Sequence, residues 1–172
     1  MQNKDKINTP GTEHTNEIKP GTVVALGMFD GMHVGHKKII DATVLIARQS
    51  GLVPAVFTFK NHPQELFGKK ILRLCSNETR AALMRRQGIE LVDEVEFTSA
   101  IRDLSAESFI RMLAERLNPK IIVAGFNYTF GKKKQGTARR FKGFAKNTES
   151  KRRLFSPCFW GASLFQAREF ET

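Results

Sequence analysis

The sequence has little cysteine and no long apolar run among its 172 residues. Its two cysteines, Cys75 and Cys158, form neither the paired spacing of a zinc site nor a disulfide framework, which is typical of a reducing compartment. No stretch approaches the roughly 18 consecutive apolar residues that a membrane-spanning helix needs. Residues 1–21 are also too polar for a signal peptide. We therefore expect a cytoplasmic protein without a membrane partner.

Acidic residues are scarce at one end of the chain only. Residues 1–131 hold 17 basic and 14 acidic side chains, a net charge of +3, whereas residues 132–172 hold 11 and 3, a net charge of +8. Basic residues mixed with aromatic ones can bind single-stranded nucleic acid, but here they follow no helix or strand period. We expect residues 138–172 to be an aberrant, disordered basic tail, and nucleic acid not to be the partner.

The remaining pattern is that of an α/β protein. Residues 1–21 contain two proline-glycine breaks and are expected to be a mobile leader. Four apolar runs then alternate with helical patterns, which predicts a parallel sheet between two helix layers. The expected strands are 22–26, 55–59, 91–97 and 121–124, and the expected helices are 34–50, one capped by Ser76 that ends before Gly88, and one capped by Ser105 that ends at Asn118.

Three glycines and two histidines follow the first expected strand, in the stretch G-M-F-D-G-M-H-V-G-H at residues 27–36. Glycines permit a tight turn, and the first-turn amides of the following helix, together with its dipole, favour an anion such as phosphate. His33 and His36 are three residues apart, so both imidazoles can face one crevice and stabilise charge on phosphate oxygens. Two alternatives stay open: a zinc pair, for which only Asp30 offers a further ligand nearby, and a purely structural pair in a tight turn.

This stretch, G-x-F-D-G-x-H-x-G-H, resembles the signature of bacterial FAD synthetases, the FMN adenylyltransferase half of the bifunctional riboflavin kinase/FAD synthetase. Two later stretches strengthen the resemblance: T-F-K-N-H-P at 58–63 is similar to the family's T-F-x-x-H-P, and G-F-N-Y-T-F-G at 125–131 is similar to its G-x-[DN]-[FY]-x-F-G. The similarity covers residues 22–137, which we expect to form the nucleotidyltransferase domain.

The resemblance implies a Rossmann-like, HUP-type three-layer parallel sheet that joins FMN and ATP to give FAD and pyrophosphate. It implies Mg²⁺ held mainly by the ATP phosphates, and small-molecule partners only. Carried over by motif, the catalytic residues are His33 and His36. The nucleotide-binding residues are Gly27, Phe29, Asp30, Gly31, Gly35 and Asn127, and the residues at the flavin or the neighbouring rim are Phe59, His62, Pro63, Phe126 and Tyr128.

Simpler roles are open for some of these residues. His62 precedes a proline and can merely end a strand, and Phe126 and Tyr128 can be ordinary packing under a loop. The chain also departs from the family, because no S-[ST]-x-x-[IVL]-R phosphate motif follows residue 137. We therefore expect a sheet that is incomplete at the C-terminus, and hypothesise that 138–172 comes from a shifted reading frame or a truncated gene. Alternative functions are a nucleotidyltransferase with another acceptor, or a noncatalytic nucleotide- or nucleic-acid-binding remnant.

Overall fold

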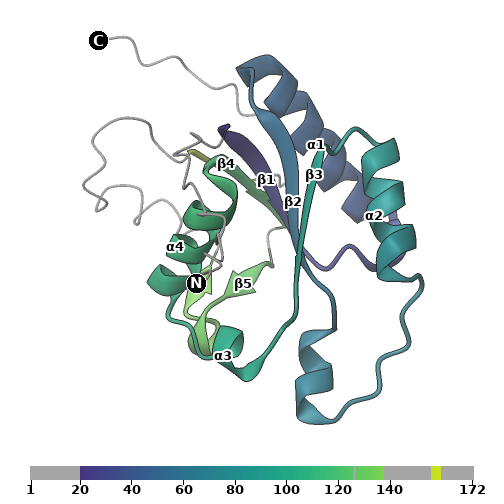
Figure 1. Ribbon diagram of the computed structural model, residues 1–172, viewed down its shortest axis with the longest axis vertical. Coiled ribbons are helices and arrows are strands. Elements are labelled where there is room, and N and C mark those ends of the chain that lie inside the picture. The colour runs from purple at the N-terminus through teal and green to yellow at the C-terminus, as the bar shows by residue number, and fades with distance from the viewer. Residues whose placement is uncertain (1–19, 126, 138–155, 160–172) are drawn as a thin grey trace, which may run out of the picture.

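The chain folds around a parallel β-sheet with helices on both faces (Figure 1). The structure, a computed structural model, describes residues 20–125, 127–137 and 156–159. Five parallel strands lie in the order β3-β2-β1-β4-β7. Their bounds are β1 Thr22–Leu26, β2 Val53–Phe59, β3 Leu91–Val95, β4 Pro119–Ala124 and β7 Ser156–Phe159. The expected α/β class and three-layer parallel sheet are confirmed.

Strand β1 is the centre of the core. All five of its residues are buried, and successive side chains point to opposite faces of the sheet. Val24 and Leu26 belong to the cluster that contains Phe109 and Leu113 of α4 (Ala106–Leu117). On the other face, Ala25 lies in the cluster of Ile40 and Met84, which come from α1 (Val34–Ser50) and α2 (Asn77–Arg86). Burial on both faces explains why β1 is almost continuously apolar.

The long helices begin and end where the capping residues predicted. The hydroxyls of Ser76 and Ser105 accept hydrogen bonds from amides in the first turns of α2 and α4, and Gly51 ends α1 in the left-handed conformation with φ 63°. Asn118 ends α4 in the same conformation, with φ 44°. Helix α1 spans 34–50 as expected, because its cap, its period and its terminating glycine all agree.

Several short elements escaped the sequence analysis. They are η1 (Asp30–Met32), η2 (Pro63–Phe67), α3 (Ser99–Arg102), η3 (Lys132–Lys134) and a hairpin of β5 (Thr129–Phe130) with β6 (Gly136–Thr137). Each has two to five residues, which is too few to show a hydrophobic period. Strand β2 also begins two residues before the expected start, and β3 ends two residues before the expected end.

Strand β7 corrects one expectation. No regular element was expected in residues 138–172, yet Ser156–Phe159 pairs in parallel with β4, from Ile121 to Ala124. This strand contains Pro157, which argues against a strand inside a sheet but is tolerated at an edge, where β7 lies. The sheet therefore has a fifth strand. The rest of 138–172 and residues 1–19 of the expected leader lie outside the described residues.

The strand order reverses between β1 and β4. The chain proceeds outward from β1 through β2 to β3, and then returns to place β4 on the other side of β1. In open α/β sheets, ligands bind at the carboxyl ends of the strands that flank such a reversal. The segments after Leu26 and Ala124 are therefore the natural place for a site.

In the described part of the chain, no helix is both long enough and apolar enough to cross a membrane.

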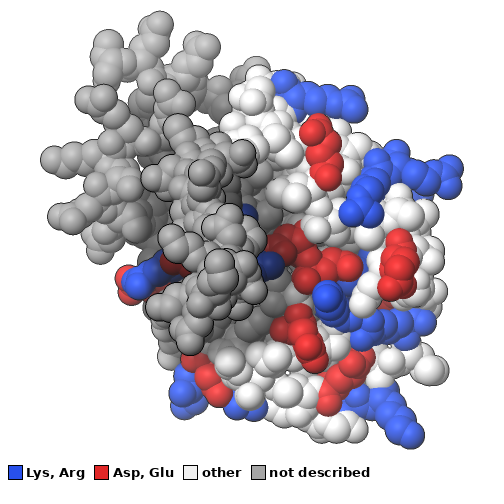
Figure 2. Space-filling view, in the orientation of Figure 1, with Lys and Arg blue, Asp and Glu red and all other residues white. Residues whose placement is uncertain are grey.

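Surface charge on the described part is mixed. In the face shown in Figure 2, Lys and Arg side chains alternate with Asp and Glu side chains over the white surface. This agrees with the small net charge of residues 1–131, where 17 basic residues face 14 acidic ones. The mixed signs on this face do not resemble the continuous basic surface of a nucleic-acid-binding domain.

Candidate functional site

The loop after β1 is held in an unusual backbone shape. Phe29, Gly31 and Met32 all have left-handed φ values, of 53°, 67° and 43°. Phe29 is fully buried, and its ring lies directly under Gly27, where an added Cβ would come within 2.9 Å of the ring. The glycine at 27 is therefore required by the buried Phe29. The aromatic ring fixes the loop to the core from below.

Asp30 and Gly31 join this loop to the segment before α2. The Asp30 carboxylate accepts a hydrogen bond from the Leu74 amide at 3.1 Å, and the Cys75 thiol lies 4.0 Å from the same oxygen. A Cβ on Gly31 would overlap the Leu74 side chain. Both residues thus have a structural role beside the nucleotide-binding role that the resemblance implied.

His33 is the N-cap of α1. Its Nδ1 accepts hydrogen bonds from the amides of Gly35, at 3.1 Å, and His36, at 3.4 Å. An imidazole nitrogen that accepts cannot carry a proton, so the neutral ring holds its proton on Nε2. Gly35 lets the ring lie this close, because a Cβ there would come within 3.1 Å of it. The exposed His33 ring is therefore oriented with a hydrogen-bond donor at its outer nitrogen.

This cap changes one expectation. The first-turn amides of α1 were expected to face a bound anion, but two of them, from Gly35 and His36, donate to the His33 ring instead. The dipole of the 17-residue helix remains favourable for negative charge. Donors toward a phosphate would then come largely from the imidazoles themselves.

His36 stacks on His33 and rests on the buried Phe29. The two imidazole centroids are 3.6 Å apart with an interplanar angle of 25°, and the Phe29 ring meets His36 edge-on at 5.4 Å. Burial lowers the pKa of His36 below its ordinary value of 6.5, and repulsion from His33 when that ring is protonated lowers it further. The backbone and carboxylate of Asp30 oppose this shift to a smaller extent. His36 is therefore neutral at pH 7 and can donate a hydrogen bond without carrying a charge.

The lowered pKa of His36 gives a testable titration. We expect the His36 Cε1–H signal in an NMR pH titration to have a midpoint below 6.5, and the midpoint to rise when inorganic tripolyphosphate is added, because a nearby anion favours the charged imidazole. Folding stability that depends on neutral His36 should be present above pH 6.5 and decline as the pH falls below it. The His36→Gln variant assigns the signal. A midpoint at or above 6.5 in the free protein would contradict this assignment of the site.

The T-F-K-N-H-P stretch lies beside this loop. The buried Thr58 hydroxyl donates to the Met28 carbonyl at 3.2 Å, which ties the end of β2 to the loop after β1. His62 caps η2, since its Nδ1 accepts from the Gln64 amide at 3.1 Å, and Pro63 opens that short helix. The Phe59 ring packs edge-on against Phe57 and Phe97. These contacts fit the structural roles that were left open, and they place the stretch at the same edge as His33.

The G-F-N-Y-T-F-G stretch at 125–131 follows β4, which lies on the other side of β1 from β2. Gly125 follows β4 and accepts a hydrogen bond from the Tyr128 amide at 3.0 Å, and a Cβ on Gly125 would lie 3.7 Å from Ile39 of α1. Asn127 is exposed at this turn. Tyr128 stacks on Phe130, and burial raises the pKa of its hydroxyl. Phe126, expected at the flavin, lies outside the described residues.

Arg80 is a buried residue that the sequence analysis missed. It lies on α2 with only 2% of its surface exposed, and its guanidinium donates to the carbonyls of Met28, at 3.0 Å, and Phe59, at 2.8 Å. Both carbonyls lie at the carboxyl ends of the strands next to the site. The sequence does contain a signal for a buried arginine here. Arg80 falls on the same helix face as the apolar Met84, and a charged residue is unusual on such a face.

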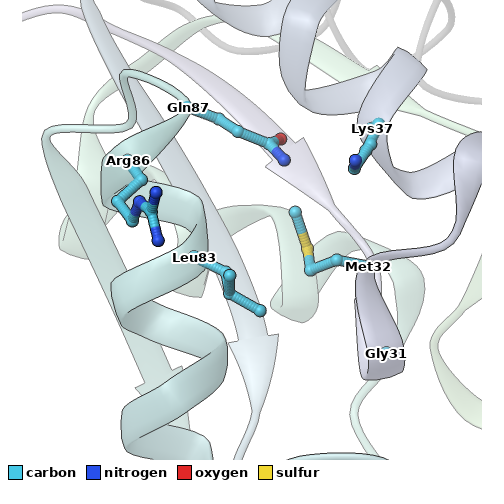
Figure 3. A pocket seen from close by; sticks show the side chains of 6 residues that line it. All are labelled: Gly31, Met32, Lys37, Leu83, Arg86 and Gln87. Carbon is cyan, nitrogen blue, oxygen red and sulfur yellow. The ribbon is translucent and has the colours of Figure 1, made fainter.

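A hollow lies behind the loop, between the start of α1 and the end of α2. Its volume is about 490 Å³, and Figure 3 shows Lys37, Arg86 and Gln87 around it, together with the backbone of Gly31 and the apolar side chains of Met32 and Leu83. Of the expected site residues, only Gly31 lines this hollow. The hollow is therefore a neighbour of the histidine pair and not the pair's own crevice.

A zinc site was the alternative for the two histidines. Within the part of the chain that the structure describes, no group of three or more His, Cys, Asp or Glu side chains is placed to hold a metal ion. Asp30, the carboxylate nearest in sequence, is engaged with Leu74. The donors that the loop offers are imidazole N–H groups, which suit phosphate oxygens.

Comparisons with known proteins show which family the chain resembles. A sequence model of the FAD synthetase family matches residues 15–158, which extends the similarity past residue 137 and through most of β7. The bifunctional riboflavin kinase/FMN adenylyltransferase of Listeria monocytogenes is 38% identical over 117 residues, which are 66% of this chain and 37% of that protein. The Bacillus subtilis protein of the same name is 37% identical over 127 residues, 72% of this chain and 40% of the relative.

Two further matches are more distant. A second Listeria monocytogenes protein, an FAD synthetase, is 27% identical over 122 residues, 68% of this chain and 48% of its own length. A crystal structure from Streptococcus pneumoniae, titled a macrolide-efflux protein, superposes with a TM-score of 0.70 at 29% identity and covers 82% of this chain and 45% of that one. The chain thus spans less than half the length of each of these relatives.

Proposed function

Because the chain belongs to the FAD synthetase family, we propose that it transfers the adenylyl group of ATP to FMN, giving FAD and pyrophosphate. The relatives are named FMN adenylyltransferases or FAD synthetases, and the three motifs of this chain meet at one edge of the sheet. The observation that carries the proposal is the stacked pair of His33 and His36 at the start of α1, with the proton of His33 fixed on Nε2. We place the reaction in the cytoplasm.

The reaction needs charge stabilisation more than acid-base chemistry. A phosphate oxygen of FMN attacks the α-phosphorus of ATP, a new P–O bond forms, and the bond from the α-phosphorus to the bridging oxygen breaks. The electron pair of that bond leaves with pyrophosphate. Positioning and electrostatic stabilisation dominate such transfers. The Nε2–H group of His33 and a ring N–H group of His36 are proposed to donate hydrogen bonds to the phosphate oxygens on which negative charge grows.

The remaining motif residues are proposed to shape the binding sites. Gly27, Phe29, Gly31 and Gly35 give the loop its form, while Asp30 holds it to the segment that contains Leu74. Exposed Asn127 is proposed to contact the nucleotide from the β4 side. Phe59, His62, Pro63, Phe126 and Tyr128 are proposed to form the flavin side or its rim. Mg²⁺ is proposed to enter bound to the ATP phosphates, which offer the oxygen ligands that it prefers.

The assay is direct. The purified protein is incubated with FMN, ATP and Mg²⁺, and FAD and pyrophosphate are measured by chromatography and a coupled assay. We expect the two products to form in equal amounts, and neither to form when FMN is left out. Absence of FAD above a protein-free control would contradict the proposed function. Pyrophosphate released with a different phosphorylated acceptor, but not with FMN, would instead favour a nucleotidyltransferase of another specificity.

A further inference from the structure

Arg80 joins four parts of the protein at the carboxyl edge of the sheet. Besides the carbonyls of Met28 and Phe59, its guanidinium donates to the Glu94 carboxylate at 2.8 Å and to the Asn77 side chain at 3.0 Å. The loop after β1, the end of β2, strand β3 and the start of α2 therefore share one guanidinium. The Glu94 side chain is only 18% exposed, so the positive charge is buried together with its counterion.

The carbonyl of Met28 lies where the loop after β1 leaves the core. Phe29, the next residue, adopts the left-handed conformation, and the chain then turns through η1 to His33. This single carbonyl accepts hydrogen bonds from both Arg80, at 3.0 Å, and Thr58, at 3.2 Å. Two donors from two elements fix its direction. A carbonyl that rotated would move Phe29, on which the His36 ring rests.

We propose that Arg80 is a positioning residue for the adenylyl transfer: it acts on His36 through the backbone of Met28 and the ring of Phe29. This inference rests on the proposed function. It assigns Arg80 no contact with the substrate, because its terminal nitrogens are already engaged with protein acceptors. Small displacements of a catalytic group lower the rate of a reaction that depends on positioning.

The geometry explains why arginine is needed rather than another cation. The two terminal nitrogens of the guanidinium reach Met28 and Phe59 separately, in a fixed planar fork. A lysine ammonium keeps the positive charge for Glu94, but a single nitrogen cannot hold both carbonyls in their present directions. The Arg80→Lys change therefore removes the fork and keeps the charge.

The first test compares two conservative variants. In Arg80→Lys we expect kcat for FAD formation to fall about 10- to 100-fold, while KM for ATP changes less than about threefold. The matched control is Arg116→Lys. Arg116 also pairs with a carboxylate of β3, Asp93, at 2.6 Å, but it comes from α4 and has no contact with the loop after β1 in the described part of the chain. We expect its kcat to equal that of the unchanged protein, and an unchanged kcat in Arg80→Lys would overturn the proposal.

The second test asks whether Arg80 acts through His36. If it does, the double variant Arg80→Lys/His36→Ala should be no slower than His36→Ala alone, because the group that Arg80 positions is already gone. If the loss of kcat in the double variant equals the product of the losses in the two single variants, the proposal is overturned. Should Arg80→Lys fail to fold, Thr58→Val takes its place in both tests. This variant removes the second donor to Met28 and keeps the side-chain shape, and we expect a smaller fall in kcat, about three- to tenfold, with the same lack of additivity.

A third measurement does not depend on FAD formation. We expect the His36 Cε1–H signal to change its chemical shift and titration midpoint in Arg80→Lys or Thr58→Val, and to stay unchanged in Arg116→Lys. If the unchanged protein makes no FAD, the proposed function fails, and this measurement alone decides the positioning role. Signals that are identical in all the variants would overturn it.

Discussion

Replacement of His36 by alanine should lower kcat for FAD formation about 10²- to 10³-fold, because it removes one of the two hydrogen-bond donors that we propose for the charge that develops in the transition state. The His36 ring stacks on His33 at 3.6 Å and rests on Phe29, so both rings are pre-oriented before any substrate binds. The fold should be retained, since His36 is only half-buried at the first turn of α1. Initial rates and circular dichroism check the two parts of this expectation.

His33 offers a matched pair of variants for the same prediction. His33→Ala removes both the outer N–H donor and the helix cap, so it should lower activity and also cost about 1 kcal/mol of folding free energy. His33→Asn supplies a good capping oxygen without the imidazole. We expect it to lose as much activity as His33→Ala while keeping the unfolding free energy of the unchanged protein. FAD formation that survives the loss of both imidazoles would show that the mechanism is wrong.

The parts of the fold that could be predicted are those with several agreeing local signals. Helix 34–50 was predicted to the residue because its apolar period, its start after the glycine loop and Gly51 at its end coincide. Strand β1 was predicted to the residue because it is buried on both faces. Strand β7 was missed because it carries few local signals: it has four residues, one of them a proline, and its register is set by its pairing with β4.

The candidate site likewise has one part that local sequence signals predict and one part that depends on contacts between distant residues. The histidine pair could be predicted, because two imidazoles three residues apart at a helix start must share a face. The donors that hold the loop could not be predicted, because Arg80 and Thr58 lie 52 and 30 residues from the Met28 carbonyl that they contact. Nor could the sequence show that the Nδ1 of His33 takes two of the amides that had been assigned to an anion.

Several motif glycines now have a specific steric reason. Gly27 leaves room for the ring of Phe29, Gly31 leaves room for Leu74, and Gly35 leaves room for the ring of His33. In each case the close neighbour is a protein side chain, so the glycines shape the loop before any ligand is bound. The G-x-F-D-G-x-H-x-G-H pattern is therefore in large part a folding pattern that presents two imidazoles.

Replacement of Phe29 by alanine should have the largest effect on stability. Its ring is fully buried in the cluster with Ile40 and Met84, and deletion of such a ring leaves a cavity that lowers the free energy of unfolding by about 3–5 kcal/mol. The ring also buries His36, so its removal should raise the pKa of His36 back toward its ordinary value of 6.5. Urea unfolding and the NMR titration of His36 measure these two effects.

Phe57→Ala is the matched control for Phe29→Ala, because Phe57 is equally buried but packs on the α4 face of the sheet. It should lose a similar free energy of unfolding, about 3–5 kcal/mol, and leave the pKa of His36 low. Phe29→Leu fills much of the cavity, and it keeps the titration measurable if the alanine variant is too unstable. Two results would show that the Phe29 ring does not support the loop after β1. One is that Phe29→Ala costs no more than a surface substitution, about 0.5 kcal/mol. The other is that both alanine variants shift the pKa of His36 alike.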